Sequence, residues 1–467
     1  MSKKLDVVNP FNGELVESLP LADETAINAV VARAVAARDA WGQTPLFKRA
    51  EIMYRYADLI MENMEDLVRL HAREMGKTIR QGRIDTVTAV NIIRGYTEKA
   101  RHLYGDVFPA DNFAGLENDF IFTVREPIGV AACVIPFNFP IDLFAHKMAP
   151  AVIMGNPVIV KAPSANPLAM LKLSALFEQA GGPAGVVQSL VCEREVCQDS
   201  LIEHPDIKIV SMTGSTATGL KMAAGGAKSL KRVFLELGGN DPTIVLDDAD
   251  VDYAVEEIAF GRIYNTGQTC CACKRFLIHE KLAAEFTDKL ITRLKKVVIG
   301  DPLDEKTEMG TLISETAAKQ VMAQIEHTVA QGAKLAYGGQ MNGAVVTPTV
   351  LTGVTRDMDV AVDLEIFGPV FPIITFATDD EAVEIANATQ YGLQGGIITR
   401  DMIRSMRLAG RLQCGCVTLN GQGNYRHIEQ PFGGYKMTGI GREGISHTLE
   451  EFSQLKTMVM RRVFDRK

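Results

Sequence analysis

Apolar residues follow two periods along the chain, one typical of helices and one typical of strands. Residues 24–41 carry them at i, i+3, i+4, i+7 and i+8, which predicts an amphipathic helix after an extended start. The same period continues from Lys48 to Gly76 and predicts one longer helix, with the glycine as its C-terminal stop. We assign the inward side chains of both helices to the core.

From Ile128 onward, short apolar runs alternate with helical stretches. The runs at 128–135, 158–161, 186–191 and 207–212 predict strands. The stretches between them predict helices over 141–154, from Pro167, which can open a helix at its first turn, and over 196–203. This alternation indicates a parallel sheet covered by helices on both faces, the doubly wound arrangement that binds nucleotides.

A second α/β segment follows this first one. Strand-like runs at 232–237 and 243–246 lead into it, and further apolar runs occur at 276–279, 345–351 and 370–376. We predict the boundary at the Gly238-Gly239 hinge. Near the end, residues 432–442 are rich in glycine and predict an irregular loop. The tail from Glu451 to Val463 alternates loosely and has no core of its own.

Composition narrows the class of protein. A chain of 467 residues is too long for one ordinary core, and 47% hydrophobic with 23% charged residues is a globular composition. A net charge of −8 argues against a nucleic-acid or anionic membrane surface. The N-terminal residues do not develop the apolar core of a signal peptide, and no uninterrupted apolar run has the length of a membrane span. We therefore expect a cytoplasmic protein of two or three domains that acts on a small molecule.

The cysteines predict reduced thiols and no metal site. Eight of them are scattered through a large chain without a secretion signal, a distribution that does not suggest disulfides. Cys271 with Cys273, and Cys414 with Cys416, have Cys-x-Cys spacing, whereas structural zinc usually uses Cys-x2-Cys. No nearby pair of histidines completes a tetrahedral set.

Two glycine-flanked positions carry candidate chemistry. Glu236 opens Glu-Leu-Gly-Gly-Asn, and Cys270 follows Asn-Thr-Gly-Gln-Thr. A cysteine is a useful nucleophile only as thiolate, so it needs a base or a positive environment and a backbone that lets substrate approach. In a third segment, Gly214 and Ser215 connect a predicted strand to a helix, a turn at which backbone N–H groups can face a pyrophosphate. Each signal alone is weak.

Taken together, these segments resemble the aldehyde dehydrogenase superfamily. Four further blocks arrive in that family's order, and the resemblance spans nearly the whole chain. The blocks are Pro136-Phe-Asn-Phe-Pro140, Met212-Thr-Gly-Ser-Thr216, Glu365-Ile-Phe-Gly-Pro369 and Pro431-Phe-Gly-Gly-Tyr-Lys436. The resemblance implies a Rossmann-like cofactor domain, a second α/β catalytic domain and a small β extension for oligomerisation. Within the family, the chain is similar to the lactaldehyde and succinate-semialdehyde dehydrogenase branch.

The resemblance also implies three catalytic residues. Cys270 matches the nucleophile, and Cys271 and Cys273 are its structural neighbours. Asn138 matches the oxyanion-hole asparagine, whose amide joins the Cys270 backbone N–H. Glu236 matches the base that activates water to hydrolyse a thioester. Oxidation of an aldehyde to an acid needs these three roles, because a tetrahedral adduct gives up hydride more readily than a planar aldehyde.

A nicotinamide dinucleotide is the implied cofactor. Lys161 matches the lysine that binds the adenosine ribose, Glu365 the carboxylate on the nicotinamide ribose, and Phe367 the aromatic beside the nicotinamide. The matching cofactor positions further include Ile135, Pro136, Phe137, Gly214, Ser215 and Leu237. NAD-specific members carry a glutamate three positions after this lysine, whereas this chain has Ser164. A carboxylate would repel a 2′-phosphate and a hydroxyl can bind it, so we predict that NADP is accepted, with NAD as the alternative.

Possible cations near the site suggest a small polar or anionic aldehyde. His146 stands eight residues after Asn138, where many relatives have an aromatic residue and several have arginine. Arg262 precedes Cys270 by eight residues, and Arg426 lies in the segment before Pro431. Each could equally be a solvated or salt-bridged group. The missing arginine at position 146 argues against a simple succinic semialdehyde enzyme.

The predicted organisation has three parts. Residues 1–108 and 128–237 form the dinucleotide-binding domain, 238–440 the catalytic domain, and 109–127 with 441–467 the oligomerisation segments. By resemblance, the tail and residues 120–124 supply strands to a neighbouring subunit, which implies a homodimer or homotetramer. Three alternatives remain. One is a CoA-acylating aldehyde dehydrogenase, but such enzymes generally lack the base that Glu236 matches. The others are a non-catalytic cofactor-binding member, which would be expected to have lost a catalytic residue, and a thiol-redox protein, which would need Cys-x-x-Cys spacing.

Overall fold

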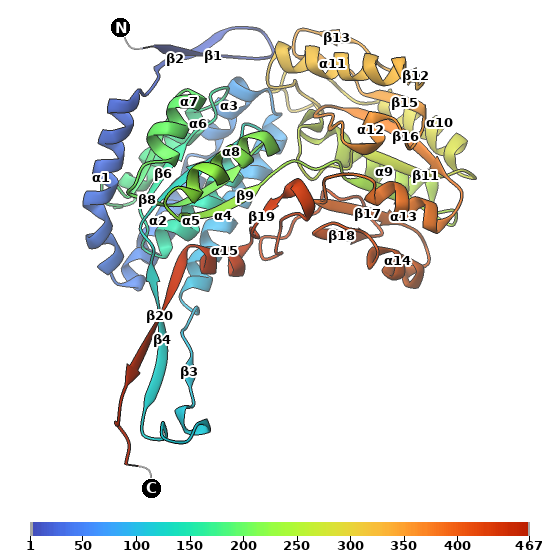
Figure 1. Cartoon of the computed structure of the whole chain (residues 1–467). Coiled ribbons are helices and arrows are strands. Elements are labelled where there is room, and N and C mark those ends of the chain that lie inside the picture. The colour runs from blue at the N-terminus through green and yellow to red at the C-terminus, as the bar shows by residue number, and fades with distance from the viewer. Residues whose placement is uncertain (1–2, 466–467) are drawn as a thin grey trace.

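The computed structural model describes residues 3–465, which form two lobes and a projecting β arm (Figure 1). The first lobe is built on a six-stranded sheet in the order β19-β9-β8-β5-β6-β7. Its strands are β5 (Val130–Val134), β6 (Val158–Lys161), β7 (Val187–Leu190), β8 (Ile207–Thr213), β9 (Arg232–Glu236) and β19 (Gly439–Ile440). All pairs are parallel except β19 with β9. The predicted doubly wound sheet is confirmed.

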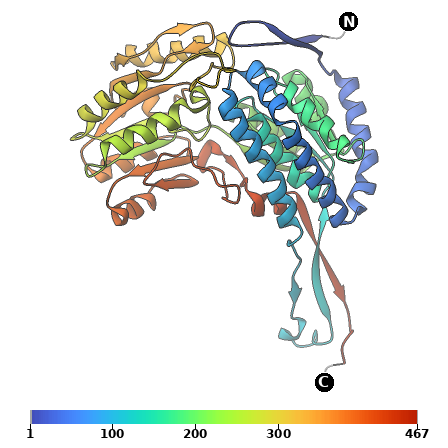
Figure 2. The same cartoon turned by 180° about the vertical axis from the view of Figure 1, so that it is seen from behind.

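Helices cover both faces of this sheet because its strands are apolar on both sides. Ala131 and Cys133 face a core shared with α2, α4, α5 and α6, while Ala132 and Val134 face α1 and the helices after β7. The helices are α1 (Glu24–Gln43), α2 (Leu46–Glu62), α3 (Met64–Met75), α4 (Ile79–Ala100), α5 (Pro140–Ile153), α6 (Leu168–Gln179), α7 (Arg194–Cys197), α8 (Thr216–Ala227) and α15 (Ile445–Glu451). Figure 2 shows α1 to α4 from behind.

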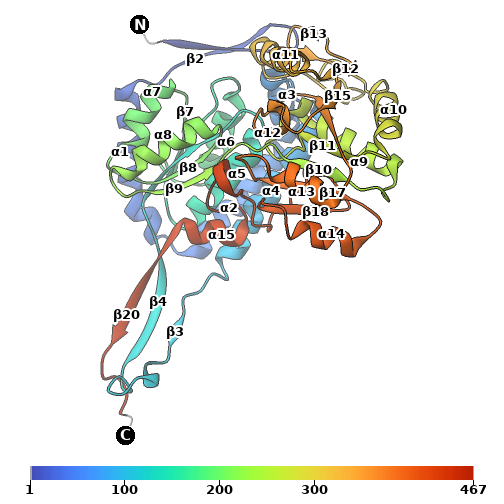
Figure 3. The ribbon, with the colours of Figure 1, turned by 45° about the vertical axis from the view of Figure 1, so that its right-hand side comes forward.

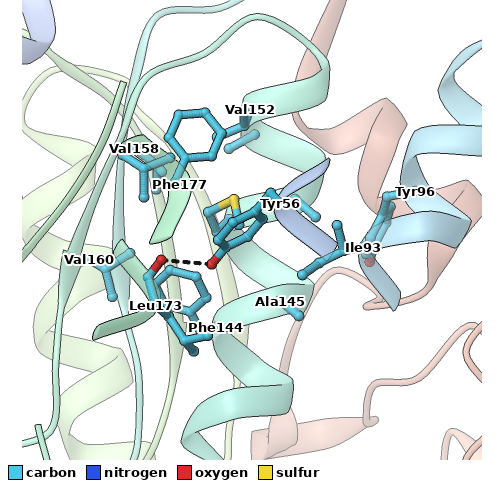
Figure 4. Packing of buried hydrophobic residues seen from close by; sticks show 14 of the residues in the cluster. Tyr56, Ile93, Tyr96, Phe144, Ala145, Val152, Val158, Val160, Leu173 and Phe177 are labelled. Carbon is cyan, nitrogen blue, oxygen red and sulfur yellow. Dashed lines mark hydrogen bonds between the residues drawn. The ribbon is translucent and has the colours of Figure 1, made fainter. Parts of the chain in front are cut away.

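Figure 4 shows the core under α2, α5 and α6. Tyr56 is fully buried, and its hydroxyl donates to the Leu173 carbonyl at 3.0 Å. The Phe177 ring meets Tyr56 edge-on at 5.6 Å between centroids. Burial of each such side chain contributes about 1.5–3 kcal/mol, and the hydroxyl bond removes the cost of its buried polar atom.

The second lobe contains a seven-stranded sheet in the order β12-β15-β16-β11-β10-β17-β18. Its strands are β10 (Pro242–Val245), β11 (Arg275–His279), β12 (Lys334–Tyr337), β15 (Thr349–Val354), β16 (Val370–Phe376), β17 (Gln394–Ile398) and β18 (Cys416–Leu419). Its helices are α9 (Val251–Ile263), α10 (Ala283–Leu294), α11 (Glu315–Ala330), α12 (Asp359–Val362), α13 (Asp379–Asn387) and α14 (Met402–Ala409). Phe276 packs with α9 and α10, and the next residue, Leu277, packs with α11 to α14.

The arm is a three-stranded antiparallel sheet that projects away from both lobes (Figure 3). It consists of β3 (Val107–Phe108), β4 (Phe120–Pro127) and β20 (Ser453–Met460). β20 pairs with β4 of the same chain over its whole length, from Ser453 opposite Pro127 to Met460 opposite Phe120. The predicted segments therefore pair with each other, and their role in an oligomer stays a prediction. Two hairpins complete the strands, β1 (Lys4–Val8) with β2 (Leu15–Pro20) and β13 (Met341–Asn342) with β14 (Val345–Val346).

Three local predictions were wrong. The single helix from Lys48 is two helices, because Asn63 ends α2 and its side-chain amide donates to the Leu59 carbonyl at 2.9 Å. The run at 345–351 is broken at Pro348, which has no N–H for a strand ladder. Part of the glycine-rich loop at 432–442 forms β19 and closes the edge of the first sheet.

Three further features of the described residues concern membrane helices, disulfides and metal sites. None of their helices has the length and apolarity to cross a membrane. All eight cysteines are free thiols. Residues 3–465 also contain no group of three or more His, Cys, Asp and Glu side chains placed to hold a metal ion.

Candidate active site

The carboxyl ends of four parallel strands place most of the predicted site residues along one edge of the first sheet. Lys161 pairs with Val134 at the end of β5, and Glu236 pairs with Thr213 at the end of β8. Backbone bonds continue this alignment past the strands, from the Gly214 N–H to the Glu236 carbonyl at 3.0 Å and from the Ile135 N–H to the Lys161 carbonyl at 3.2 Å. Such an edge is where open α/β sheets bind ligands.

The start of α8 has the features of a phosphate site. Ser215 is its exposed N-cap and accepts from the Thr218 N–H at 3.4 Å. The other N–H groups of the first turn have no helical partner, and with the helix dipole they favour an anion. Gly214 keeps this approach free of a side chain. The segment therefore fits the pyrophosphate of a dinucleotide.

Lys161 ends strand β6, and Ser164 lies in the loop that follows it. The Lys161 ammonium is buried, which lowers its pKa, and its nearest polar contact is the exposed Ser164 hydroxyl at 3.5 Å. Within residues 3–465 no carboxylate pairs with Lys161 in an ion pair. A buried ammonium without an anionic partner fits the hydroxyls or phosphate of a nucleotide ribose.

Phe137, Phe367 and Glu365 come together from both lobes. The two rings meet edge-on at 6.0 Å between centroids. Glu365 accepts from the Gly239 N–H at 3.3 Å and pairs with Lys274 at 3.3 Å, and Lys274 is buried. Sequence reasoning missed Lys274, because a lysine in a cysteine-rich loop carries no sign of its partner. Pro136 directly precedes Phe137 in the chain, and a side chain at Gly238, the neighbour of Leu237, would meet the Glu365 carboxylate.

The loop before Cys270 has a strained backbone. After α9 ends, Asn265 and Thr266 adopt positive φ values of 49° and 55°. The Thr266 conformation is rare for a β-branched residue and costs about 1–3 kcal/mol. Gly267 follows with φ 75°, and a side chain there would collide with the Gly368 carbonyl. The result is a partly exposed Cys270 in a segment whose other residues from 265 to 273 are buried.

Asn138 is held against this loop. It is buried in the connection between β5 and α5, and its carbonyl accepts from the Asn265 side-chain amide at 2.9 Å. A second donor, the Lys77 ammonium, reaches the same carbonyl at 3.0 Å. The structure therefore places Asn138 beside the loop that leads to Cys270, and its role in an oxyanion hole stays a prediction.

The surroundings of Cys270 favour a thiolate. A hydrogen bond with the Cys271 thiol, together with the positive charges of Lys274 and Arg426, lowers the pKa of the Cys270 thiol although burial opposes it. The same bond and burial raise the pKa of Cys271 well above its usual value. Burial raises the pKa of Cys273 to about 11. The three neighbouring thiols thus differ, and only Cys270 combines exposure with a lowered pKa.

Glu236 has the opposite shift. Burial, and then the negative charges of Glu443 and the Cys270 thiolate, raise the pKa of Glu236 well above its usual value. Its Oε2 atom is buried and has no hydrogen-bond partner among the described residues. An unpartnered buried carboxyl oxygen needs an explanation, and a bound water would supply its missing bond.

A charge cluster that sequence reasoning missed lies behind Glu236. Glu443 accepts from Lys147 at 3.2 Å and from Arg426 at a short distance, and all three side chains are largely buried. Burial would raise the pKa of Glu443, but the positive charges of Lys147 and Arg426 outweigh it and lower that pKa. Two cations share one carboxylate, so the cluster keeps one net positive charge.

Two predicted substrate residues have other roles. Arg262 is buried, and its guanidinium donates to the carbonyls of Ile366, Val370 and Gly267 at 2.6–3.4 Å, so it is not available to a substrate. His146 is also buried, and burial, followed by the charge of Arg426, lowers its pKa to about 3. It is a neutral partner of the Tyr96 hydroxyl at 3.2 Å, not a cation. Of the three candidates, only Arg426 keeps a charge beside Cys270.

Comparison with known proteins gives a consistent picture over the whole chain. The model of the aldehyde dehydrogenase family matches residues 1–458. A 3-sulfolactaldehyde dehydrogenase from Priestia aryabhattai is 34% identical over 462 residues, which cover 98% of this chain and 95% of the relative. A lactaldehyde dehydrogenase from Methanococcus aeolicus is 33% identical, with 98% and 97% covered.

Solved structures extend the comparison to three dimensions. A succinate-semialdehyde dehydrogenase from Burkholderia pseudomallei has a TM-score of 0.95 and 35% identity, with 98% of this chain and 95% of that chain covered. A glyceraldehyde-3-phosphate dehydrogenase from Methanocaldococcus jannaschii, complexed with NADP, has a TM-score of 0.93 and 33% identity, with 99% of each chain covered.

Proposed function

The chain belongs to the aldehyde dehydrogenase family, and from this premise we propose that it oxidises a small anionic or polar aldehyde to the acid by covalent catalysis on Cys270. The observation that carries the proposal is the opposite tuning of two groups beside one loop. Cys270 has a lowered pKa and is partly exposed, whereas Glu236 has a raised pKa and a free buried oxygen. A nucleophile and a base need these opposite shifts.

In the proposed mechanism, the Cys270 thiolate adds to the aldehyde carbonyl carbon. The negative charge that develops on the carbonyl oxygen is stabilised by the Asn138 amide and the Cys270 backbone N–H. The bound nicotinamide cofactor supplies the hydride acceptor. Cys270 is left as a thioester with the acyl group.

Water then resolves the thioester. Glu236 takes a proton from a water molecule, the oxygen attacks the acyl carbon, and the carbon–sulfur bond breaks to return the Cys270 thiolate and release the acid. Burial is the main cause of the raised pKa of Glu236, and the charges of the Lys147, Glu443 and Arg426 cluster modify it. This hydrolytic step separates the proposal from a CoA-acylating enzyme, in which a thiol would take the place of water.

Charge supports an anionic substrate. Arg426 and Lys147 share Glu443, so one positive charge is left over beside Cys270. The relatives named above act on a sulfonated, a carboxylated and a phosphorylated aldehyde, and one acts on uncharged lactaldehyde. We assign recognition of the anionic end to Arg426, which is tested against neutral aldehydes below.

For the cofactor we propose NADP, with NAD also accepted. Support comes from the exposed Ser164 hydroxyl beside the buried Lys161 ammonium, since among the described residues no carboxylate pairs with Lys161 that would repel a 2′-phosphate. A solved relative is complexed with NADP. We also propose a cytoplasmic homodimer or homotetramer, in which strand β20 contributes to the subunit contact.

The test is an assay of the purified chain without CoA. Succinate semialdehyde, 3-sulfolactaldehyde and lactaldehyde are each combined with NADP or NAD, and both the reduced nicotinamide and the acid product are measured. We expect acid to form in equal amount to reduced cofactor, with kcat/KM about tenfold or more higher for the charged aldehydes. Turnover that appears only when CoA is added and ends in the CoA thioester, or no turnover with any aldehyde, would contradict the proposal.

A further inference from the structure

The further inference concerns Lys77, which lies outside the charge cluster and contacts the predicted oxyanion hole from behind. Gly76 ends α3 in a left-handed conformation, with φ 81°, and Lys77 then enters the interior before α4 begins. Lys77 is only 2% exposed. A lysine is rarely buried to this degree unless it is paired, so its partners indicate what the burial serves.

The Lys77 ammonium has three partners. It forms a short ion pair with Asp85 of α4, donates to the Asn138 carbonyl at 3.0 Å, and lies 3.7 Å from the centroid of the Phe139 ring. Its three donors are therefore directed at a carboxylate, a carbonyl and an aromatic face, all of which attract a cation. Two of these partners belong to consecutive residues of the Asn138 loop.

The Asp85 carboxylate continues the contact to the catalytic loop. Its second oxygen accepts from the Tyr264 hydroxyl at 3.1 Å, and the Tyr264 ring stacks on Phe139 with a 5° angle between planes. The next residue, Asn265, donates to the same Asn138 carbonyl at 2.9 Å. One buried charge pair thus fixes the loop of Asn138 to the strained loop of Cys270.

We infer that Lys77, held by Asp85, is a positioning residue that sets the place of the Asn138 amide relative to Cys270. The inference rests on the proposed function, because it assigns a geometric role in stabilising the oxyanion. A preorganised donor acts through its position, so a small displacement lowers the rate of the chemical step more than it weakens binding. Lys77 does not touch the reacting atoms.

The decisive variants remove the charge pair as a whole. Lys77→Met alone would leave Asp85 buried and unpaired, and the protein could lose its fold for that reason. The double variant Lys77→Met/Asp85→Asn keeps the volume, leaves no buried charge, and retains an acceptor for Tyr264. We expect it to fold, with kcat for succinate semialdehyde about 10- to 100-fold lower and KM changed less than about threefold.

A double-mutant cycle separates positioning from general stability. In an Asn138→Ala background, the same double change at Lys77 and Asp85 is expected to lower kcat less than about twofold further, because the group it positions is gone. A folded variant with normal kcat, or a full additional loss in the Asn138→Ala background, would overturn the inference.

A crystal structure of the Lys77→Met/Asp85→Asn variant gives a readout that does not need turnover. We expect the Asn138 side chain to be displaced relative to Cys270, and an unchanged position would overturn the inference. If the unmodified chain oxidised none of the aldehydes, the proposed function would fail, and this structural comparison would still decide the role of Lys77.

Discussion

Buried cations in two regions of the protein have different kinds of partner. In the second lobe, Arg262 and Arg275 donate only to backbone carbonyls, and burial lowers the pKa of each to about 10. Beside the first sheet, Lys147 and Arg426 bind the carboxylate of Glu443. Burial alone would lower the pKa of Arg426, but the negative charge of Glu443 outweighs burial and raises that pKa.

The partners explain what each region does. A guanidinium on three or four carbonyls satisfies polar backbone atoms and holds loops together, so its charge is committed to the fold. Two cations on one carboxylate keep a net charge that acts on neighbouring groups, here the Cys270 thiol and Glu236. Burial alone therefore does not distinguish a structural arginine from a functional one, whereas the chemistry of its acceptors does.

The first prediction tests whether Cys270 is the group on which the Lys147, Glu443 and Arg426 cluster acts. Cys270→Ser is expected to lower kcat by about 10⁴-fold or more, because a hydroxyl beside the same cations does not ionise. Steady-state oxidation of succinate semialdehyde measures the loss. The matched variant Cys271→Ser should lose less than about tenfold. Equal losses in the two variants would show that the thiols are not distinguished as their surroundings indicate.

The second prediction contrasts the two arginines directly. Arg426→Met should lower kcat/KM for succinate semialdehyde about 10- to 100-fold, through loss of a charged hydrogen bond of about 1.5–3 kcal/mol, and should affect lactaldehyde far less. Arg262→Met leaves three buried carbonyls without donors and should destabilise the fold by about 3 kcal/mol or more, seen as a lower Tm in calorimetry. A change of substrate preference in the Arg262 variant would break the comparison.

A third variant introduces a carboxylate beside a cation that has none. Ser164→Glu places an acid next to Lys161 and should lower kcat/KM with NADP about 10- to 100-fold, because the acid repels a 2′-phosphate. The value with NAD should stay or rise. Ser164→Gln has the same size without the charge and should show a smaller loss. Similar losses for both cofactors in the glutamate variant would contradict the proposed contact.

The prediction with the smallest expected effect concerns the influence of Glu443 on the pKa of Glu236. In the proposed mechanism Glu236 acts as base when deprotonated, so activity is expected to fall as the pH drops through its raised pKa. The charge of Glu443 contributes to that raised pKa. Glu443→Gln should therefore move the acid limb of the kcat profile to lower pH, as measured by initial rates across a buffer series. A shift to higher pH would be inconsistent with this charge interaction.

The period of apolar residues predicted the first sheet well because its central strands β5, β6 and β8 are buried on both faces almost throughout. The helices α1 and α5 and the strand β6 lie within two residues of their predicted bounds. Predictions failed where side chains or distant segments decide the backbone. Asn63 ends a helix whose apolar period continues, and β19 forms only because the edge of β9 is available.

In the candidate site, too, predictions succeeded where a local motif carried the signal and failed where distant residues decide the contacts. The order of the motifs predicted catalytic roles for Cys270, Glu236 and Asn138. The structure brings the Asn138 and Cys270 loops into contact and Glu236 within electrostatic range of Cys270, and the roles stay predictions. The ion-pair partners of Lys147, Lys274 and Lys77 could not be read from the chain, since each partner is distant in sequence or gives no local signal. Arg262 was misassigned for this reason, because its charge was visible and its three carbonyl acceptors were not.

Strand β19 has a consequence for the order in which the protein matures. It returns from beyond the second lobe to pair with β9, and Gly439 lies opposite Glu236. On the ribosome, the first lobe is synthesised some two hundred residues before this strand. The nascent first lobe therefore exposes the backbone edge at Glu236 throughout translation of the second, and that edge is closed only once residue 440 has emerged.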